Sequence, residues 1–133
     1  PGLASENSKQ PPKAPGMRYR HYAPKADLTL VEGTMEEVIS KINALTREAQ
    51  AMGKSVGVLA TEENKDCYVA DHVIVIGQRQ DEAEIARHLF DVLRQFDDLQ
   101  VDLIYSESFV AAGVGQAIMN RLLKAAGHKR IFV

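Results

Sequence analysis

The stretch His72-Val-Ile-Val-Ile76 decides the fold class, because one histidine is followed by four β-branched apolar residues without a polar interruption. A strand with one face in water alternates apolar and polar residues, whereas this run is apolar on both faces. Comparable short runs occupy residues 28–31, 55–60, 101–105 and 130–133, and longer segments with helical spacing separate them. Strands that alternate with helices predict an α/β domain. We therefore expect a three-layer, Rossmann-like open sheet, mainly parallel and of about five strands.

Three helices are expected between these strands. Thr34 and Glu37 form a capping box, in which each side chain binds a free amide at the start of the first helix. Asp81 with Glu84 marks the start of the second helix, and residues 115–126 form the third. The expected apolar faces are Met35, Val38, Ile39, Ile42, Leu45, Ala49 and Met52 on the first helix, and Ile85, Leu89, Val92, Leu93 and Phe96 on the second.

The composition changes near residue 26, which predicts a domain boundary. All five prolines fall within the first 24 residues. Residues 1–26 carry five basic side chains against one acidic one, net +4, whereas residues 27–133 carry eleven against seventeen, net −6. We expect an extended Pro-rich linker at 1–26 and a folded body at 27–133, and the start at Pro1 without methionine suggests a piece of a longer protein. The acidic body is a poor partner for nucleic-acid phosphates.

The single cysteine and the N-terminal sequence bear on location. Cys67 alone cannot build a disulfide framework, which is usual in a reducing cytosol. The sequence shows neither the apolar core of a signal peptide nor an apolar run of membrane-spanning length. We expect a cytoplasmic protein with no membrane partner. Cys67 beside Asp71 and His72 could form a nucleophile with its base, but a lone cysteine before a strand favours a small buried apolar side chain.

Three loops follow strands at the sheet edge where parallel α/β domains bind ligands. Thr61-Glu-Glu-Asn64 is typical of a helix N-cap and a solvated first turn. Ser106-Glu-Ser108 suits either a ribose or cation contact or an exposed turn. Gly113-Val-Gly115 suits a tight turn or an anion site, although Ile118 stands where a dinucleotide fingerprint needs a third glycine or alanine. Ser106, Gly113 and Gly115 are therefore a candidate crevice ligand site, and the body shows no metal pattern or catalytic constellation.

The N-terminal segment holds the most specific chemistry. Residues 18–22 contain two arginines, two tyrosines and a histidine, bracketed by Pro15-Gly16 and Pro24. Such a run has no apolar face to bury, and flexible spacers are built from Gly, Ser and Glu instead. Rings beside cations suit a nucleotide or another anionic aromatic ligand. The alternative is an ordered linker whose tyrosines only dock on the domain surface.

Two motifs carry a resemblance to a known family. Lys13-Ala-Pro-Gly-Met-Arg-Tyr-Arg-His-Tyr-Ala-Pro24 resembles the linker of the two-domain form of threonylcarbamoyl-AMP synthase. Gly113-Val-Gly-Gln-Ala-Ile-Met-Asn-Arg-Leu-Leu-Lys-Ala-Ala126 is similar to the signature of the family's C-terminal domain, and Tyr105-Ser-Glu-Ser-Phe109 fits upstream of it. One departure is Ala14, where the family usually has serine.

The resemblance implies a role for each part of the chain. By this resemblance, the family's catalytic N-terminal domain, a nucleotidyltransferase, is absent here. That domain condenses L-threonine, bicarbonate and ATP, with Mg²⁺, into threonylcarbamoyl-AMP. The product is used for tRNA modification, so tRNA is expected to be only an indirect partner. The linker folds over the catalytic cleft, and the accessory C-terminal domain alone is inactive. The substrate contacts that the resemblance implies for the linker are Arg18, Tyr19, Arg20, His21 and Tyr22, and Pro15 and Gly16 form its bend. The alternative is a non-catalytic module that binds a regulatory nucleotide or metabolite, or docks RNA.

Overall fold

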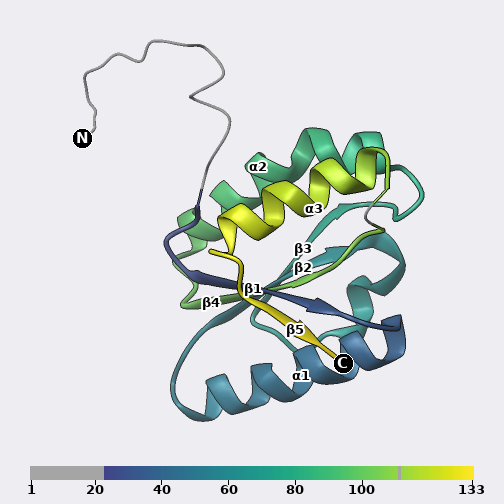
Figure 1. Ribbon diagram of the computed structural model, residues 1–133. Coiled ribbons are helices and arrows are strands. Elements are labelled where there is room, and N and C mark those ends of the chain that lie inside the picture. The colour runs from purple at the N-terminus through teal and green to yellow at the C-terminus, as the bar shows by residue number, and fades with distance from the viewer. Residues whose placement is uncertain (1–22, 111) are drawn as a thin grey trace, which may run out of the picture.

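A computed structural model describes residues 23–110 and 112–133 of the chain. Within this part, five strands form one sheet in the order β3-β2-β4-β1-β5, and all neighbouring pairs are parallel. The strands are β1 (Asp27–Glu32), β2 (Val56–Thr61), β3 (His72–Gly77), β4 (Leu103–Glu107) and β5 (Arg130–Phe132). Helix α1 (Met35–Ala51) covers one face of the sheet, and α2 (Glu82–Leu99) and α3 (Val114–Ala125) cover the other (Figure 1). The expected three-layer α/β sheet is confirmed, and it is parallel throughout the described residues.

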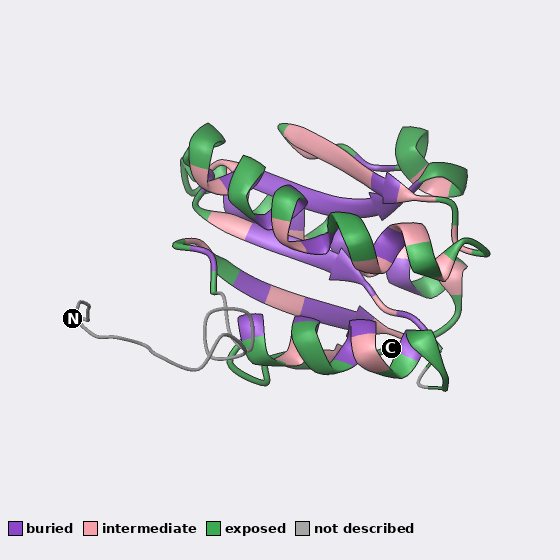
Figure 2. Ribbon diagram, turned by 90° about the horizontal axis from the view of Figure 1, so that it is seen from above, coloured by how far each residue is buried: buried purple, intermediate pink, exposed green. Residues whose placement is uncertain are grey.

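Apolar side chains fill both faces of this sheet, and the buried residues follow the strands in Figure 2. Leu30, Leu59 and Ile104 belong to the core under α2 and α3. Their strand neighbours Val31 and Val58 belong to the second core, under α1. Successive residues of a strand point to opposite faces, so a strand between two cores must be apolar at nearly every position. This explains the uninterrupted apolar runs in the sequence.

The helix starts agree with the expected caps, with one correction. The hydroxyl of Thr34 accepts a hydrogen bond from the backbone N–H of Glu37 at 3.3 Å, and Asp81 accepts from the N–H of Glu84 at 3.2 Å. The Glu37 carboxylate, however, accepts from the Thr34 hydroxyl at 3.0 Å. The reciprocal contact of the capping box is therefore made between two side chains, instead of between the carboxylate and a backbone amide.

The apolar face of α2 is as expected, whereas that of α1 differs at its C-terminal end. All five predicted residues of α2 are buried. On α1, Met52 is 72% exposed because it is the C-cap residue, beyond the last helical turn. Thr46 takes a buried position on this helix instead. The spacing therefore predicts the buried Val38, Ile42 and Ala49 correctly, but the expected apolar face extends one residue beyond the end of the helix at Ala51.

Strand β4 lies two residues later than its expected range of 101–105. Asp102 holds the turn before the strand, because its carboxylate accepts the backbone N–H of Ser55 at 2.9 Å. The backbone N–H groups of Asp102 and Leu103 in turn donate to the carbonyl of Ser55. Pairing with β1 and β2 then starts at Leu103. The shift moves Ser106 and Glu107 from the expected loop into the buried end of the strand.

At the carboxyl end of β4, the chain leaves the sheet toward a different face than it does after the neighbouring strands. Neighbouring β1 continues into α1, and neighbouring β2 continues into the 3₁₀ helix η2 (Glu62–Cys67), whose following residue Tyr68 belongs to the core under α1. Strand β4 instead continues into α3 on the opposite face (Figure 1). Parallel sheets bind their ligands at such a switch point. The side chains that end β2 and β4 therefore define a candidate site.

Candidate functional site

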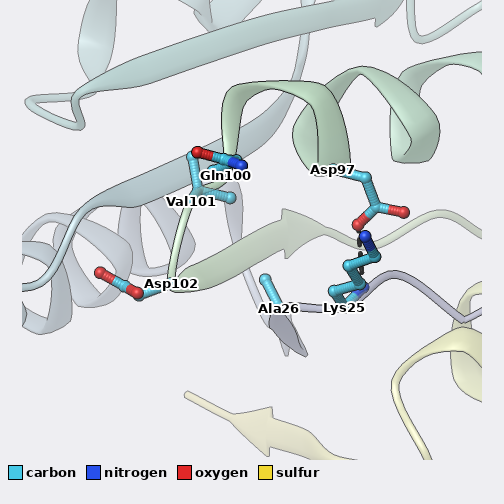
Figure 3. Close-up of a pocket in the computed structure, with 6 residues that line it drawn as sticks. All are labelled: Lys25, Ala26, Asp97, Gln100, Val101 and Asp102. Atoms are coloured by element: carbon cyan, nitrogen blue, oxygen red, sulfur yellow. Dashed lines mark hydrogen bonds between the residues drawn. The ribbon is translucent and has the colours of Figure 1, made fainter.

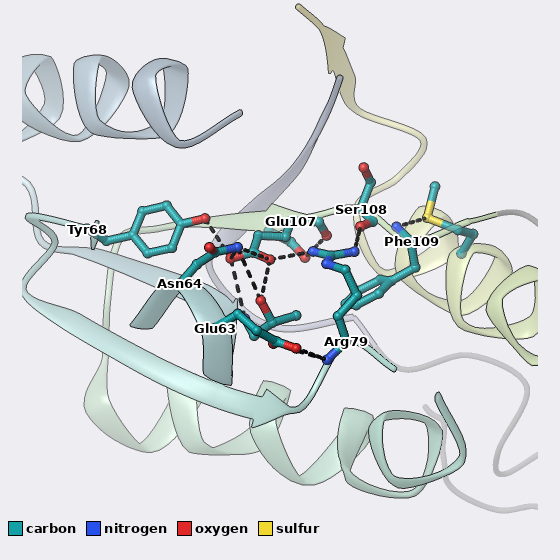
Figure 4. A network of polar contacts seen from close by, with 10 residues as sticks. Glu63, Asn64, Tyr68, Arg79, Glu107, Ser108 and Phe109 are labelled. Atoms are coloured by element: carbon teal, nitrogen blue, oxygen red, sulfur yellow. Dashed lines mark hydrogen bonds and ion pairs between the residues drawn. The ribbon is translucent and has the colours of Figure 1, made fainter. Parts of the chain in front are cut away.

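The switch point is occupied by a buried carboxylate, that of Glu107, which has no exposed surface. It accepts hydrogen bonds from the side chains of Thr61, Asn64, Tyr68 and Arg79 (Figure 4). The Tyr68 hydroxyl is 2.6 Å from one carboxylate oxygen, and a guanidinium nitrogen of Arg79 is 2.5 Å from the other. A charge taken out of water needs this kind of pairing, because an unpaired buried carboxylate is very costly. We call these five residues the Glu107 network.

Arg79 connects the network to the loop between β3 and α2. Its second terminal nitrogen donates to the carbonyl oxygen of Ser108 at 2.8 Å, and its guanidinium lies 4.9 Å from the centre of the Phe109 ring. Its backbone N–H donates to the Glu63 carboxylate at 3.1 Å. The Nε atom is buried and has no hydrogen-bond partner among the described residues. Arg79 therefore joins the ends of β2, β3 and β4 in one polar cluster.

The electrostatics of the network favour structure over proton transfer. Burial, reinforced by the hydrogen bond to Glu107, raises the pKa of the Tyr68 hydroxyl far above its usual range. Tyr68 therefore stays protonated and acts as a hydrogen-bond donor. Backbone N–H groups, first its own and then that of Arg79, lower the pKa of the Glu63 carboxyl. Because every oxygen of Glu107 is engaged by donors from its own chain, this carboxylate is a structural acceptor.

The candidate crevice residues have partners inside the domain. Ser106 is fully buried, and its hydroxyl donates to the carbonyl of Glu107 at 2.7 Å. Gly113 has φ 58° and precedes α3 without a side-chain cap. Gly115 packs so closely on the carbonyl of Val110 that a Cβ atom there would overlap it. The tight-turn interpretation thus has direct support, and ligand binding at Ser106, Gly113 and Gly115 stays a prediction.

One other expectation for the loops is wrong, and a second holds in part, since Thr61 is the N-cap residue of η2 and Glu62 and Glu63 in its first turn are exposed. Ser106 and Glu107 do not form an exposed turn, since both are fully buried at the end of β4. Asp102 sets the later start of this strand, and the ion pair with Arg79 compensates the burial of the Glu107 carboxylate. The segment from Thr61 to Asn64 is only partly a solvated turn. Its first residue is buried and its last donates to Glu107, although Glu62 is exposed beside Lys65.

The lone cysteine is also placed differently from the expectation. Cys67 is exposed, because it ends η2 outside the sheet. Its backbone carbonyl accepts from the side chain of Asn43 at 2.9 Å. Asp71 does not serve it as part of a catalytic group, since its carboxylate accepts the backbone N–H of Val56 at 2.8 Å. That hydrogen bond is the main reason why the pKa of Asp71 lies below its usual range.

The described residues contain neither a metal-binding cluster nor a membrane-spanning helix. In residues 23–110 and 112–133, no three His, Cys, Asp or Glu side chains are grouped so that they could hold a metal ion. In the same ranges, no helix is both long and apolar enough to cross a bilayer.

The predicted substrate contacts at residues 18–22, and the bend at Pro15-Gly16, lie outside the described residues. The structure does describe the point where this segment joins the domain. Pro24 is buried, and the backbone N–H of Lys25 donates to the Asp97 carboxylate at 2.8 Å. A cavity of about 290 Å³ opens beside this contact (Figure 3), and its lining residues are Lys25, Ala26, Asp97, Gln100, Val101 and Asp102.

Comparison with known proteins decides the family. Residues 2–127 match the family described as "Threonylcarbamoyl-AMP synthase, C-terminal domain". The chain belongs to this family. It is 48% identical over 130 residues to the threonylcarbamoyl-AMP synthase of Bacillus subtilis (strain 168), an alignment that covers 98% of this chain and 36% of that protein. The chain thus spans about a third of the length of this relative.

Two solved structures of the family resemble the chain closely. The crystal structure of Pyrococcus abyssi Sua5 complexed with L-threonine has a TM-score of 0.76 and 43% identity, over 96% of this chain and 36% of that one. The C-terminal Sua5 domain from Pyrococcus horikoshii has a TM-score of 0.67 and 35% identity, over 84% of this chain and 100% of that one. The resemblance that the two motifs indicated is confirmed.

In this threonylcarbamoyl-AMP synthase C-terminal domain, sequence reasoning singled out the loops that contain Thr61, Asn64 and Glu107, but it missed Tyr68, Arg79 and the network that joins them. Tyr68 and Arg79 stand alone in polar segments and belong to no motif. The available signal was weak: a carboxylate directly after an apolar strand, with an arginine shortly after the previous strand. Only the strand order brings the carboxylate and the arginine together, because the strands that precede them, β4 and β3, are separated in the sheet by β2 alone.

Proposed function

We propose that this chain is the accessory C-terminal domain and active-site lid of an ATP-dependent L-threonylcarbamoyladenylate synthase. The observation that carries the proposal is the family match over residues 2–127, which includes the linker motif at 13–24. The Bacillus subtilis relative, 48% identical, is named for this activity. Since the chain spans only about a third of that relative, the chemistry belongs to a catalytic domain outside it.

In the complete enzyme, L-threonine, bicarbonate and ATP would give threonylcarbamoyl-AMP and pyrophosphate, in the cytoplasm. The Pyrococcus abyssi relative, which was crystallised with L-threonine, supports threonine as a substrate. The product would serve tRNA modification, so tRNA is an indirect partner. ATP would bring Mg²⁺ to the catalytic domain.

The linker would act by closing over the bound adenylate. Arg18 or Arg20 would meet phosphate charge, and His21 or Tyr22 would meet the polar or ring edges of the nucleotide. A closed lid excludes water from a labile carbamoyl-adenylate, and it must reopen to release pyrophosphate. The chain by itself is expected to be inactive, since the proposal assigns the activation of threonine and bicarbonate to the catalytic domain.

The lid is tested by the double substitution His21→Ala and Tyr22→Ala in the full-length enzyme. If each contact contributes about 1 to 1.5 kcal/mol, kcat/KM for adenylate formation falls roughly 30- to 150-fold. Pyrophosphate release measures the rate. The matched control is Lys9→Ala with Gln10→Ala, which removes two polar side chains of the same linker outside the motif. Wild-type kinetics in the His21 and Tyr22 variant would sink the lid proposal.

A second candidate function is the binding of an anionic metabolite by the body itself. One observation favours it: the buried Nε of Arg79 lacks a partner among the described residues, and it lies at the switch point where α/β sheets bind ligands. Two observations argue against it. Arg79 already forms an ion pair with Glu107, and Ser106 is fully buried, so neither side chain is open to a ligand.

Isothermal titration separates the two functions. We expect no binding heat when ATP is added to residues 23–133, which keep the body but lack residues 13–22 of the linker motif. The Pyrococcus horikoshii domain, crystallised without the rest of its protein, indicates that such a piece folds. A saturable heat that disappears on Arg79→Lys would favour the metabolite-binding function instead.

A further inference from the structure

The segment that leads from η2 into β3 lies on the α1 side of the sheet and has little buried surface of its own. We call residues 67–71 the strap. Tyr68 is its one buried residue, and the other four are exposed or partly buried. A segment with few buried apolar contacts and exposed hydrogen bonds opens at a lower free energy than the core does.

Two amide side chains of α1 hold the strap. Asn43 uses both ends of its amide: the nitrogen donates to the carbonyl of Cys67 at 2.9 Å, and the oxygen accepts the backbone N–H of Val69 at 3.0 Å. Gln50 donates to the carbonyl of Val69 at 3.3 Å, and its nitrogen lies 3.4 Å from the Asp71 carboxylate. All four contacts are exposed, so water competes for the same groups and each adds only modestly to stability.

The strap also contacts the sheet at two points. The Tyr68 hydroxyl donates to the buried carboxylate of Glu107 at 2.6 Å (Figure 4). Further along the strap, the Asp71 carboxylate accepts the backbone N–H of Val56, the first residue of β2, at 2.8 Å. Gln50 touches the strap between these points and at Asp71 itself. The two contacts with the sheet are therefore linked through α1.

We propose that the strap is a conformational device, which opens and closes over the buried end of the Glu107 network as one unit, with Asn43 as its latch. Opening withdraws one side-chain donor from Glu107, the Tyr68 hydroxyl, and leaves the ion pair with Arg79 in place. The switch point then offers a carboxylate acceptor that the closed domain hides. This behaviour belongs to the folded domain, whatever the linker does.

Amide hydrogen exchange in the 133-residue chain tests the latch. The reporter is Val56, because the acceptor of its N–H is Asp71 and not Asn43. In Asn43→Ala, exchange at Val56 becomes about tenfold faster, since the loss of two exposed hydrogen bonds favours the open strap. Asn43→Asp keeps the acceptor for Val69 and gives a smaller increase. Arg47→Ala, at an exposed position of the same helix, is the matched control and leaves the rate unchanged. Unchanged exchange at Val56 in Asn43→Ala overturns the latch.

Tyr68→Phe tests whether the strap moves as one unit. The substitution removes a hydroxyl that binds neither the Val56 nor the Val69 N–H. Both amides should exchange faster, and by the same factor, about fivefold to tenfold, because one opening exposes them both. Different factors would mean that the two ends of the strap open separately, which overturns the unit.

Leu122→Ala separates the opening of the strap from unfolding of the whole domain. Leu122 is fully buried in the core under α2 and α3, on the face of the sheet opposite to the strap. Its truncation should speed exchange at a core amide such as that of Ile104 and leave Val56 and Val69 unchanged, because the strap opens without unfolding that core. Equal acceleration at all three amides would mean that the strap opens only on global unfolding, and it would overturn the proposal.

Discussion

Glu107→Ala is expected to lower the free energy of unfolding by about 3 to 5 kcal/mol, because removing one partner of a buried ion pair leaves the other uncompensated. The substitution removes the acceptor of the Tyr68 hydroxyl and the charged partner of Arg79, whose guanidinium keeps only its hydrogen bond to the Ser108 carbonyl. The Tyr68 hydroxyl is held in the core under α1, whereas the Arg79 side chain is 30% exposed, so most of the loss comes from the buried end of the network. Urea denaturation of the 133-residue chain, followed by circular dichroism, measures the loss.

Two variants show whether the burial of the charge is responsible. Glu107→Gln keeps the shape and one acceptor oxygen, so its loss should be smaller than that of the alanine variant. Glu62→Ala removes an exposed carboxylate paired with Lys65 and should cost less than about 0.5 kcal/mol. A Glu107→Ala protein within about 1 kcal/mol of the wild type would contradict the network as a stabilising element.

Phe96→Ala is expected to lower the free energy of unfolding by about 3 to 5 kcal/mol, the range for truncating a fully buried aromatic ring. Phe96 is among the largest side chains with almost no exposed surface. Its ring lies against Gly57 of β2, at a position where a Cβ atom would overlap the ring carbons. The missing side chain at Gly57 therefore makes room for the ring that joins α2 to the sheet. The same urea titration provides the measurement.

Leu99→Ala is the matched control on the same helix, and it should cost less than about 1 kcal/mol because the side chain is 43% exposed. A double-mutant cycle then tests the contact itself. Gly57→Ala should cost about 1 to 3 kcal/mol in the wild type and clearly less in the Phe96→Ala background, where the ring is gone. Additive effects of the two substitutions would mean that the glycine and the ring do not depend on each other.

The Glu107 network also bears on the choice between the two functions. In parallel α/β domains, the crevice at the switch point is the usual ligand site. In this domain, side chains from η2 and from the loop before α2 already meet Glu107 there. The polar groups that a ligand would need are thus largely satisfied by the chain itself. This favours the proposed accessory role over the binding of a ligand by the body.

The sequence by itself determined the fold class, the helix caps and the family. These features depend on local patterns: uninterrupted apolar runs mark strands between two layers, and a threonine or aspartate three positions before a glutamate marks a helix start. The five apolar positions of α2 follow from helical spacing alone. The two long motifs likewise needed no tertiary information, since the resemblance lies in the order of residues.

Only the tertiary structure decided the strand order, the start of β4 and the partners of its polar residues. The apolar pattern from Val101 to Tyr105 cannot reveal that Asp102 is held by Ser55, 47 positions away. Burial of Glu107 likewise depends on its ion pair with Arg79. Arg79 follows β3, and β3 lies close enough to β4 for this contact because only β2 stands between them in the sheet. A side chain's burial and charge state depend on neighbours that are distant in sequence, so no local pattern specifies them.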